Sequence, residues 1–173
     1  MLEWGTIKLQ WGIVDKYGDN IEFWGYLFKN MFIGEYQHLI DDKGRIAVPS
    51  KFRSLLKGGV IMTKGLDHCL FVFDKKSWQP IAEKIKALPF SQANARAFSR
   101  LMLGSAMEAN LDVQGRILLP DYLRDYAGLK KQTIITGVYN RLEIWDEEQW
   151  KKYKDRTEAS SEDIAENLDG LGI

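Results

Sequence analysis

Short apolar segments, separated by glycines and charged residues, occupy most of the chain between residues 31 and 146. Segments rich in β-branched and aromatic residues predict strands, at 36–40, 45–48, 60–63, 70–73, 107–111, 116–119, 133–136 and 142–145. Apolar residues at helical spacing instead predict helices at 75–87 and 92–103, with Pro89 between them. The pattern indicates an α+β protein that is mainly β.

The eight predicted strands belong to two copies of one unit. Residues 41–53 (DDKGRIAVPSKFR) align without gaps with residues 112–124 (DVQGRILLPDYLR), and Asp, Gly, Arg, Ile, Pro and the final Arg are identical. With a shift of one residue the similarity continues from 65–78 to 137–150. This many coincidences in one register indicate an internal repeat.

Each copy has the same predicted order of elements: strand, glycine turn, strand, short helix and a pair of strands. Proline favours the first turn of a helix, so Pro49 and Pro120 predict short helices at 49–56 and 120–127. One copy of about 45 residues can hardly bury enough apolar surface to fold alone. We therefore expect the two copies to intertwine, and their open strand edges to favour assembly between chains.

The sequence divides into five parts. They are an extension at 1–30, a first repeat domain at 35–77, a helical connector at 78–104, a second repeat domain at 106–149 and an acidic tail at 157–173. The tail is rich in serine and short of aromatic residues, which predicts disorder or a loosely held terminal helix.

Charge is balanced overall but unevenly distributed. The chain has 24 Lys/Arg and 24 Asp/Glu. Residues 31–156 contain 21 basic and 15 acidic residues, a net of +6, whereas 157–173 contains five acidic residues and no basic one. The excess in the repeats favours an anionic partner for that stretch. A single cysteine and the lack of a long apolar segment favour a cytoplasmic protein with no membrane partner.

The repeated turn carries the candidate functional residues. Its aspartate is suited to accept hydrogen bonds from turn N–H groups and to pair with the arginine four positions later, which is a structural role. The arginine at the strand start can instead face outward and contact phosphates or a guanine edge. We therefore expect the loop-structuring residues to be Asp41, Gly44, Asp112 and Gly115.

The candidate DNA-binding residues are polar or cationic positions of the same motif: Lys43, Arg45, Arg53, Gln114, Arg116 and Arg124. Gln114 replaces the lysine of the first copy and lowers the positive charge of the second turn. Arg53 and Arg124 follow the proline by one helical turn. They are suited either to clamp phosphates or, equally, to lie on a solvated helix face paired with Asp125 or Asp121.

Other chemistry has little support in the sequence. His68 and Cys69 are adjacent but lack further cysteines for a zinc site or a partner for a nucleophile, so packing is the favoured interpretation. Gly-rich phosphate loops and a nucleophile elbow are absent from the sequence. Trp78 and Trp150 are expected to pack in the core or between chains. We expect no enzyme activity, no cofactor, no metal and no small-molecule substrate.

The segment MFIGEY at 31–36, followed by the two copies of the turn motif, resembles the MraZ family of bacterial transcriptional regulators from Met31 to about Tyr153. The resemblance implies two AbrB-like, SpoVT-type domains in a pseudo-symmetric swapped-hairpin β-barrel and a ring of identical chains. It also implies a nucleoid-associated repressor that binds double-stranded DNA at repeated short G-rich elements. These lie upstream of the division and cell-wall gene cluster, which includes the regulator's own gene. Lys43 and Arg45 match the family's DNA-contacting loop, and Arg116 matches it with less basic neighbours.

Residues 1–30 have no counterpart in this family pattern. They contain Trp-Gly and Tyr-Gly pairs beginning at Trp4, Trp11, Tyr17 and Trp24. Because Trp is encoded only by TGG and Gly by GGN, each Trp-Gly pair requires TGGGGN in the gene, and permitted repeats recur at about one turn of B-DNA. One hypothesis is that this segment is translated operator DNA and that Met31 is the true start. The alternative is an additional strand hairpin.

Two functions from different classes remain open. The first is a sequence-specific DNA-binding repressor that assembles as a ring. The second is an AbrB-like structural or protein-interaction module whose arginines form salt bridges, without specific DNA binding. Retention of a promoter fragment that weakens steeply with salt would distinguish the first from the second.

Overall fold

The computed structural model describes residues 31–171. The hypotheses about residues 1–30 concern a segment outside the described residues. Residues 31–152 form one compact unit, and the described residues 153–171 belong to a second unit, so each is considered by itself. The boundaries expected for the two repeat domains and the connector stay predictions.

All eight predicted strands are present in the first unit. They are β1 (Phe32–Leu39), β2 (Arg45–Ala47), β3 (Val60–Lys64), β4 (Leu70–Asp74), β5 (Met107–Ala109), β6 (Arg116–Leu118), β7 (Gln132–Tyr139) and β8 (Leu142–Asp146). The helices are η1 (Ser50–Phe52), α3 (Lys75–Lys86), α4 (Ala93–Met102), α5 (Asp121–Tyr126), α6 (Glu147–Ala159), α7 (Ser161–Leu168) and η2 (Asp169–Leu171). The protein is therefore α+β and mainly β, as predicted.

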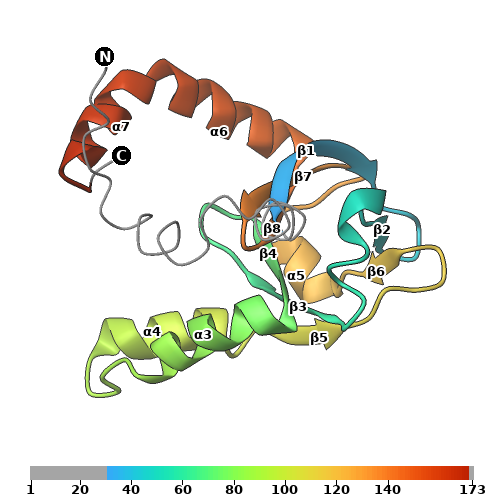
Figure 1. Cartoon of the computed structure of the whole chain (residues 1–173), viewed down its shortest axis with the longest axis horizontal. Coiled ribbons are helices and arrows are strands. Elements are labelled where there is room, and N and C mark those ends of the chain that lie inside the picture. The colour runs from blue at the N-terminus through green and yellow to red at the C-terminus, as the bar shows by residue number, and fades with distance from the viewer. Residues whose placement is uncertain (1–30, 172–173) are drawn as a thin grey trace, which may run out of the picture. The chain divides into compact units, whose positions relative to one another are not determined.

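The two copies exchange strands rather than forming separate sheets. Six strands form one antiparallel sheet in the order β1-β7-β8-β4-β3-β5, and β2 pairs with β6 in a second, two-stranded sheet (Figure 1). Strand β1 of the first copy pairs along its whole length with β7 of the second, and β5 of the second pairs with β3 of the first. The expectation that the copies intertwine is confirmed.

Several element boundaries differ from the prediction. The helix predicted at 49–56 is only the single 3-10 turn η1, followed by further turns closed by hydrogen bonds from Leu55 N–H to Phe52 O and from Leu56 N–H to Arg53 O. The chain winds here in tight i→i+3 turns, and both Phe52 and Leu56 are buried. The proline that predicted the helix favours a first helical turn without requiring further ones. Strand β1 begins at Phe32, earlier than predicted, because β7 offers a partner along that whole length. For the tail, the helical alternative is the one found.

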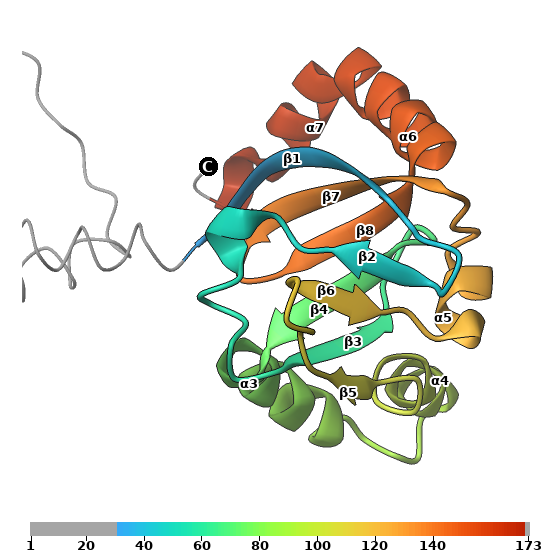
Figure 2. The same ribbon diagram turned by 90° about the vertical axis from the view of Figure 1, so that its right-hand side faces the viewer.

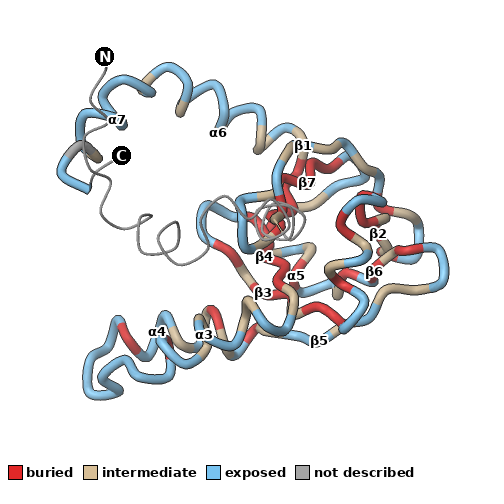
Figure 3. Tube along the Cα trace, in the orientation of Figure 1, coloured by how far each residue is buried: buried red, intermediate tan, exposed pale blue. Residues whose placement is uncertain are grey.

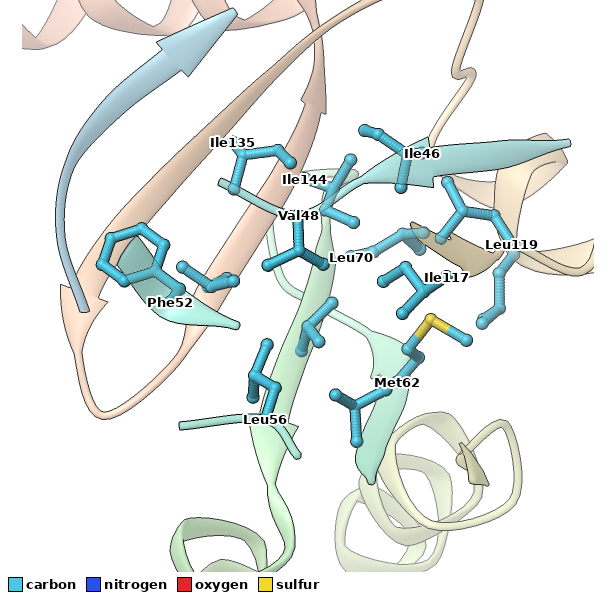
Figure 4. Close-up of a cluster of buried hydrophobic side chains, with 14 of the residues drawn as sticks. Ile46, Val48, Phe52, Leu56, Met62, Leu70, Ile117, Leu119, Ile135 and Ile144 are labelled. Carbon is cyan, nitrogen blue, oxygen red and sulfur yellow. The ribbon is translucent and has the colours of Figure 1, made fainter. Parts of the chain in front are cut away.

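One hydrophobic core serves both copies. Equivalent residues of the two repeats meet in it, and Figure 4 shows Ile46 beside Ile117, with Val48, Leu70 and Leu119 around them. The Phe52 ring packs edge-on against Phe32 at a centroid distance of 5.3 Å. Figure 3 shows burial concentrated in the strands, whereas the helices α3 and α4 are largely exposed. The strands thus form a fixed support for the turns that connect them.

Candidate nucleic-acid interface

The two-stranded sheet of β2 and β6, here called the ribbon, brings the two repeated turns onto one surface. Alternation along a strand turns Ile46 and Ile117 inward, where they are fully buried opposite each other. The outward positions are Arg45, which faces Leu118 across the ribbon, and Ala47, which faces Arg116. In Figure 2 the ribbon lies in front of the six-stranded sheet, on the side facing the viewer.

In the first turn the carboxylate of Asp41 organises the backbone. Its Oδ1 accepts hydrogen bonds from the N–H groups of Lys43 and Arg45, each at 3.0 Å. Its Oδ2 accepts from Arg45 Nε at 2.8 Å and also lies 2.8 Å from Arg45 Nη2. Gly44 has a φ of +74°, the left-handed conformation that favours glycine. Asp41 therefore holds both the backbone of the turn and the side chain of Arg45.

The second turn repeats this geometry closely. Asp112 Oδ1 accepts from the N–H groups of Gln114 and Arg116, each at 2.9 Å, and its Oδ2 accepts from Arg116 Nε at 2.8 Å. Gly115 has a φ of +77°. In both turns the aspartate has the structural arrangement considered from the sequence.

Both carboxylates are stabilised in their charged form. The hydrogen bond from the Arg45 side chain, followed by that from its backbone N–H, lowers the pKa of Asp41 to about 2. The corresponding bonds from Arg116 lower the pKa of Asp112. The two aspartates are therefore anionic at neutral pH, and each balances the charge of the arginine in its own turn.

The two turn arginines are not equivalent. Arg116 Nη1 lies 3.6 Å from Asp41 Oδ2, so this guanidinium contacts the aspartates of both turns. Arg45 pairs with Asp41 and, within the described residues, with no second carboxylate. Their side chains remain 29% and 24% exposed for Arg45 and Arg116 respectively. Arg116 is thus the more strongly tied to the protein, and Arg45 the more available to a ligand.

Arg53 and Arg124 each support the turn of the opposite copy. Arg53 Nε donates to Val48 O at 2.8 Å, and its side chain lies so close to Gly115 that a Cβ there would overlap it. Arg124 lies in the same way over Gly44, where a Cβ would be 3.3 Å from the guanidinium. The sequence showed that these arginines are repeated, but their crossed placement depends on how the copies pair.

Of the two alternatives considered for these arginines, pairing with an aspartate is found for Arg124, which contacts Asp121. Arg53 has no ion pair with a carboxylate within residues 31–171, so its local contact is the Val48 carbonyl. Direct phosphate contact by either arginine stays a prediction.

The tips of the turns are the most accessible part of the ribbon. Asp42, Lys43 and Gln114 are exposed, and Val113 is completely exposed, at 105%. The tips are therefore more open to a ligand than the half-buried arginines behind them in the sequence.

The residues for which packing is the favoured interpretation, Cys69, Trp78 and Trp150, make packing contacts in the structure. Cys69 is buried, its thiol donates to Leu66 O at 3.1 Å, and burial raises the pKa of the thiol. Trp78 packs against Phe73, and Trp150 against Trp145, each with a centroid distance of 5.3 Å. Among the described residues, no three His, Cys, Asp or Glu side chains gather where they could hold a metal ion.

Comparison with known proteins identifies the family. Residues 31–101 and 102–171 each match the family described as "MraZ protein, putative antitoxin-like". The chain belongs to the MraZ family. The double match agrees with the internal repeat, and it begins at Met31, where the resemblance found in the sequence begins.

Relatives in this family are about half identical to the chain. The transcriptional regulator MraZ of Carboxydothermus hydrogenoformans is 53% identical over 138 residues, which are 80% of this chain and 96% of the relative. That of Desulforamulus reducens is 51% identical over 80% of this chain and 97% of its own length. That of Caldanaerobacter subterraneus subsp. tengcongensis is 48% identical over 83% of this chain and all of its own length. MraZ membership thus supports a role in transcriptional regulation.

None of the helices within residues 31–171 combines the length and the apolar character needed to cross a membrane.

Proposed function

We propose that this MraZ chain is a DNA-binding repressor that places its ribbon in the major groove of double-stranded DNA. The observation that carries the proposal is the pair of hydrogen-bonded arginine turns presented on one outward face. The major groove of B-DNA admits a two-stranded β-ribbon, and arginine and lysine recognise the O6 and N7 atoms of guanine there. Because the turns are already rigid, little conformational entropy is lost on binding.

The positive charge of the core is not concentrated at the ribbon. Residues 75–104, which include α3 and α4, contain six Lys/Arg and one acidic residue, so they hold most of the net +6 of residues 31–156. Figure 1 shows these helices extending away from the side that carries β2 and β6. One ribbon therefore neutralises few phosphates, and its isolated affinity is low and sensitive to salt.

Binding by several ribbons at once would compensate for the low affinity of a single ribbon. Several identical chains in a ring would present several ribbons to tandem G-rich repeats, and each bound ribbon raises the effective concentration of the next. This arrangement suits a cytoplasmic, nucleoid-associated repressor of the division and cell-wall gene cluster, including its own gene. The partners are thus promoter DNA and further copies of the chain, and no catalytic step, cofactor or small-molecule substrate is required.

Replacement of Arg45 tests the proposal. A bidentate contact to guanine contributes about 1–3 kcal/mol per site, so Arg45→Ala should weaken binding to a promoter fragment by at least tenfold in an assembly with several ribbons. Binding is measured by gel shift at several salt concentrations, with circular dichroism and size-exclusion chromatography to establish that fold and assembly are retained. Lys76→Ala removes an exposed cation of α3 and should leave affinity close to that of the parent protein. Unchanged affinity of Arg45→Ala would contradict the proposal.

A second function is favoured by one observation: both turn arginines already pair with aspartates, as expected of an AbrB-like module that binds another protein. The two functions differ in salt dependence. Binding of promoter DNA that does not weaken between low and moderate salt, or that is equal for unrelated DNA of the same length, would favour the second.

A further inference from the structure

The two repeated turns lie at opposite ends of the ribbon. Leu119 N–H donates to Gly44 O at one end, and Val48 N–H donates to Gly115 O at the other, both at 2.9 Å. Figure 2 shows this directly, because the β1–β2 turn lies at the right end of the ribbon and the β5–β6 turn at the left. The two tips are therefore separated by at least the length of the paired strands.

The backbones of the turns are matched, but the exposed side chains are not. The first tip presents Asp42 and Lys43, and the equivalent positions of the second present Val113 and Gln114. All four residues are exposed, whereas the hydrogen bonds from the turn N–H groups to Asp41 and Asp112 agree to within 0.1 Å, at 3.0 and 2.9 Å. A ligand that contacts both tips thus meets two different chemistries in one backbone frame.

These chemistries correspond to different base pairs in the major groove. Lysine donates to guanine O6 and N7, and aspartate accepts from cytosine N4, so Asp42 and Lys43 both fit a G·C pair. Glutamine pairs with adenine N6 and N7, and an apolar side chain contacts the thymine methyl group, so Val113 and Gln114 both fit an A·T pair. At each tip the two neighbouring side chains agree in their preference.

We propose that each chain reads a directional element, with a G·C pair under the first turn and an A·T pair under the second. This inference rests on the proposed function. Four residue steps separate the hydrogen-bonded rows at Gly44 and Val48, or about 14 Å at about 3.4 Å per residue. Because the tips lie beyond these rows and base pairs rise about 3.4 Å each, the two pairs are at least about four base pairs apart.

The direction of the element is its main consequence. A protein with identical turns would bind a palindrome, because its two halves would read the two strands alike. Here the unlike tips fix which way the chain lies on the DNA. Tandem repeats in one orientation are then the natural target for several chains, and inversion of one repeat should disrupt its contact.

Exchange of the tip residues tests the inference. In the double variant Val113→Asp, Gln114→Lys the second tip carries the residues of the first. We expect its preferred pair at that position to change from A·T to G·C in a binding selection from randomised duplexes, while the preference under the first tip is retained. Lys84→Gln, at an exposed position of α3 away from the ribbon, serves as the control and should select the parental element.

A second measurement tests the contact of Val113 with thymine without changing the charge of the protein or the DNA. Replacement of thymine by uracil removes only the methyl group. It should therefore weaken DNA binding by the parent protein by about four-fold at the position under Val113, the effect expected for one buried methyl contact. Val113→Ala, at a completely exposed site, should make the protein insensitive to that replacement. Because the side chain has no buried contact to lose, we expect this variant to fold.

The outcomes separate the inference from the function on which it rests. If Arg45→Ala abolishes specific binding but tip exchange and uracil leave the selected element unchanged, the directional inference is wrong and the repressor function stands. If neither Arg45→Ala nor any tip variant affects binding, and no element is selected, both are wrong. A shifted preference at the second position alone supports both.

Discussion

At the scale of single residues, each repeated turn is built around one carboxylate with several donors. Asp41 and Asp112 accept hydrogen bonds from two backbone N–H groups and from the guanidinium of their own arginine. These bonds are made to the ionised form, which is why the pKa of Asp41 is lowered to about 2 and that of Asp112 is lowered too. The shape of the repeated turns is therefore linked to proton binding.

This linkage predicts a loss of stability in acid. Because the pKa of each aspartate is lower in the folded than in the unfolded chain, its contribution is fully present above about pH 4, the ordinary range of an aspartate. It is lost as the pH falls toward 2, through the folded pKa of Asp41. We expect Asp41→Asn and Asp112→Asn to flatten the decline of the free energy of unfolding between pH 4.5 and about 2.5, measured by urea titration. Asp42→Asn, at the exposed tip, should retain the full decline; an equally flat profile for all three variants would exclude this origin.

At the scale of elements, the pairing of β1 with β7 joins the two copies and depends on close approach of their backbones. Gly34 and Gly137 face each other in this register. A Cβ on Gly137 would lie 2.5 Å from Phe32 C and 2.6 Å from Ile33 N, which belong to the backbone of the neighbouring strand and cannot rotate away. Glycine at this position therefore allows the strands of the two copies to pair.

Gly137→Ala should consequently destabilise the protein by about 1–3 kcal/mol, as overpacking does when the backbone has to shift. The midpoint of thermal or urea unfolding measures the effect. Gly58→Ala is the matched control, because a Cβ at Gly58 would meet nothing within 4 Å. A change of the same size in both variants would show that chain entropy, rather than the contact between β1 and β7, determines the result.

The comparison of sequence and structure is also clearest for these elements. Alternation and β-branched residues predicted all eight strands, and the repeated turn predicted its own aspartate contacts, because both depend on nearby residues. The pairing of β1 with β7, the reach of Arg116 to Asp41 and the crossed positions of Arg53 and Arg124 depend on contacts between residues far apart in the chain. The 3-10 turn η1 is shorter than the helix predicted at 49–56, because the proline signal indicates where a helix can begin but not how far it continues.

At the scale of the compact unit at 31–152, neither copy has a core or a complete sheet of its own. Among the described strands, β1 pairs with β7 and β2 pairs with β6, so the first copy alone retains only the β3–β4 hairpin. The core residues Ile46 and Ile117 likewise bury each other. An isolated two-stranded hairpin is at best marginally stable in water.

Separation of the copies should therefore abolish folding of each. We expect fragments 31–101 and 102–171, prepared separately at micromolar concentration, to show the circular dichroism of unfolded chains and to exchange their amide protons rapidly. Mixed in equal amounts, they should regain strand structure, because β1 and β7 can then pair, and the midpoint of unfolding should rise with concentration. The intact chain is the control. Its two copies are covalently linked, so its unfolding midpoint does not depend on their association. Cooperative unfolding of either fragment alone, independent of its concentration, would show that one copy is a domain by itself and that the exchanged strands are not required for the ribbon.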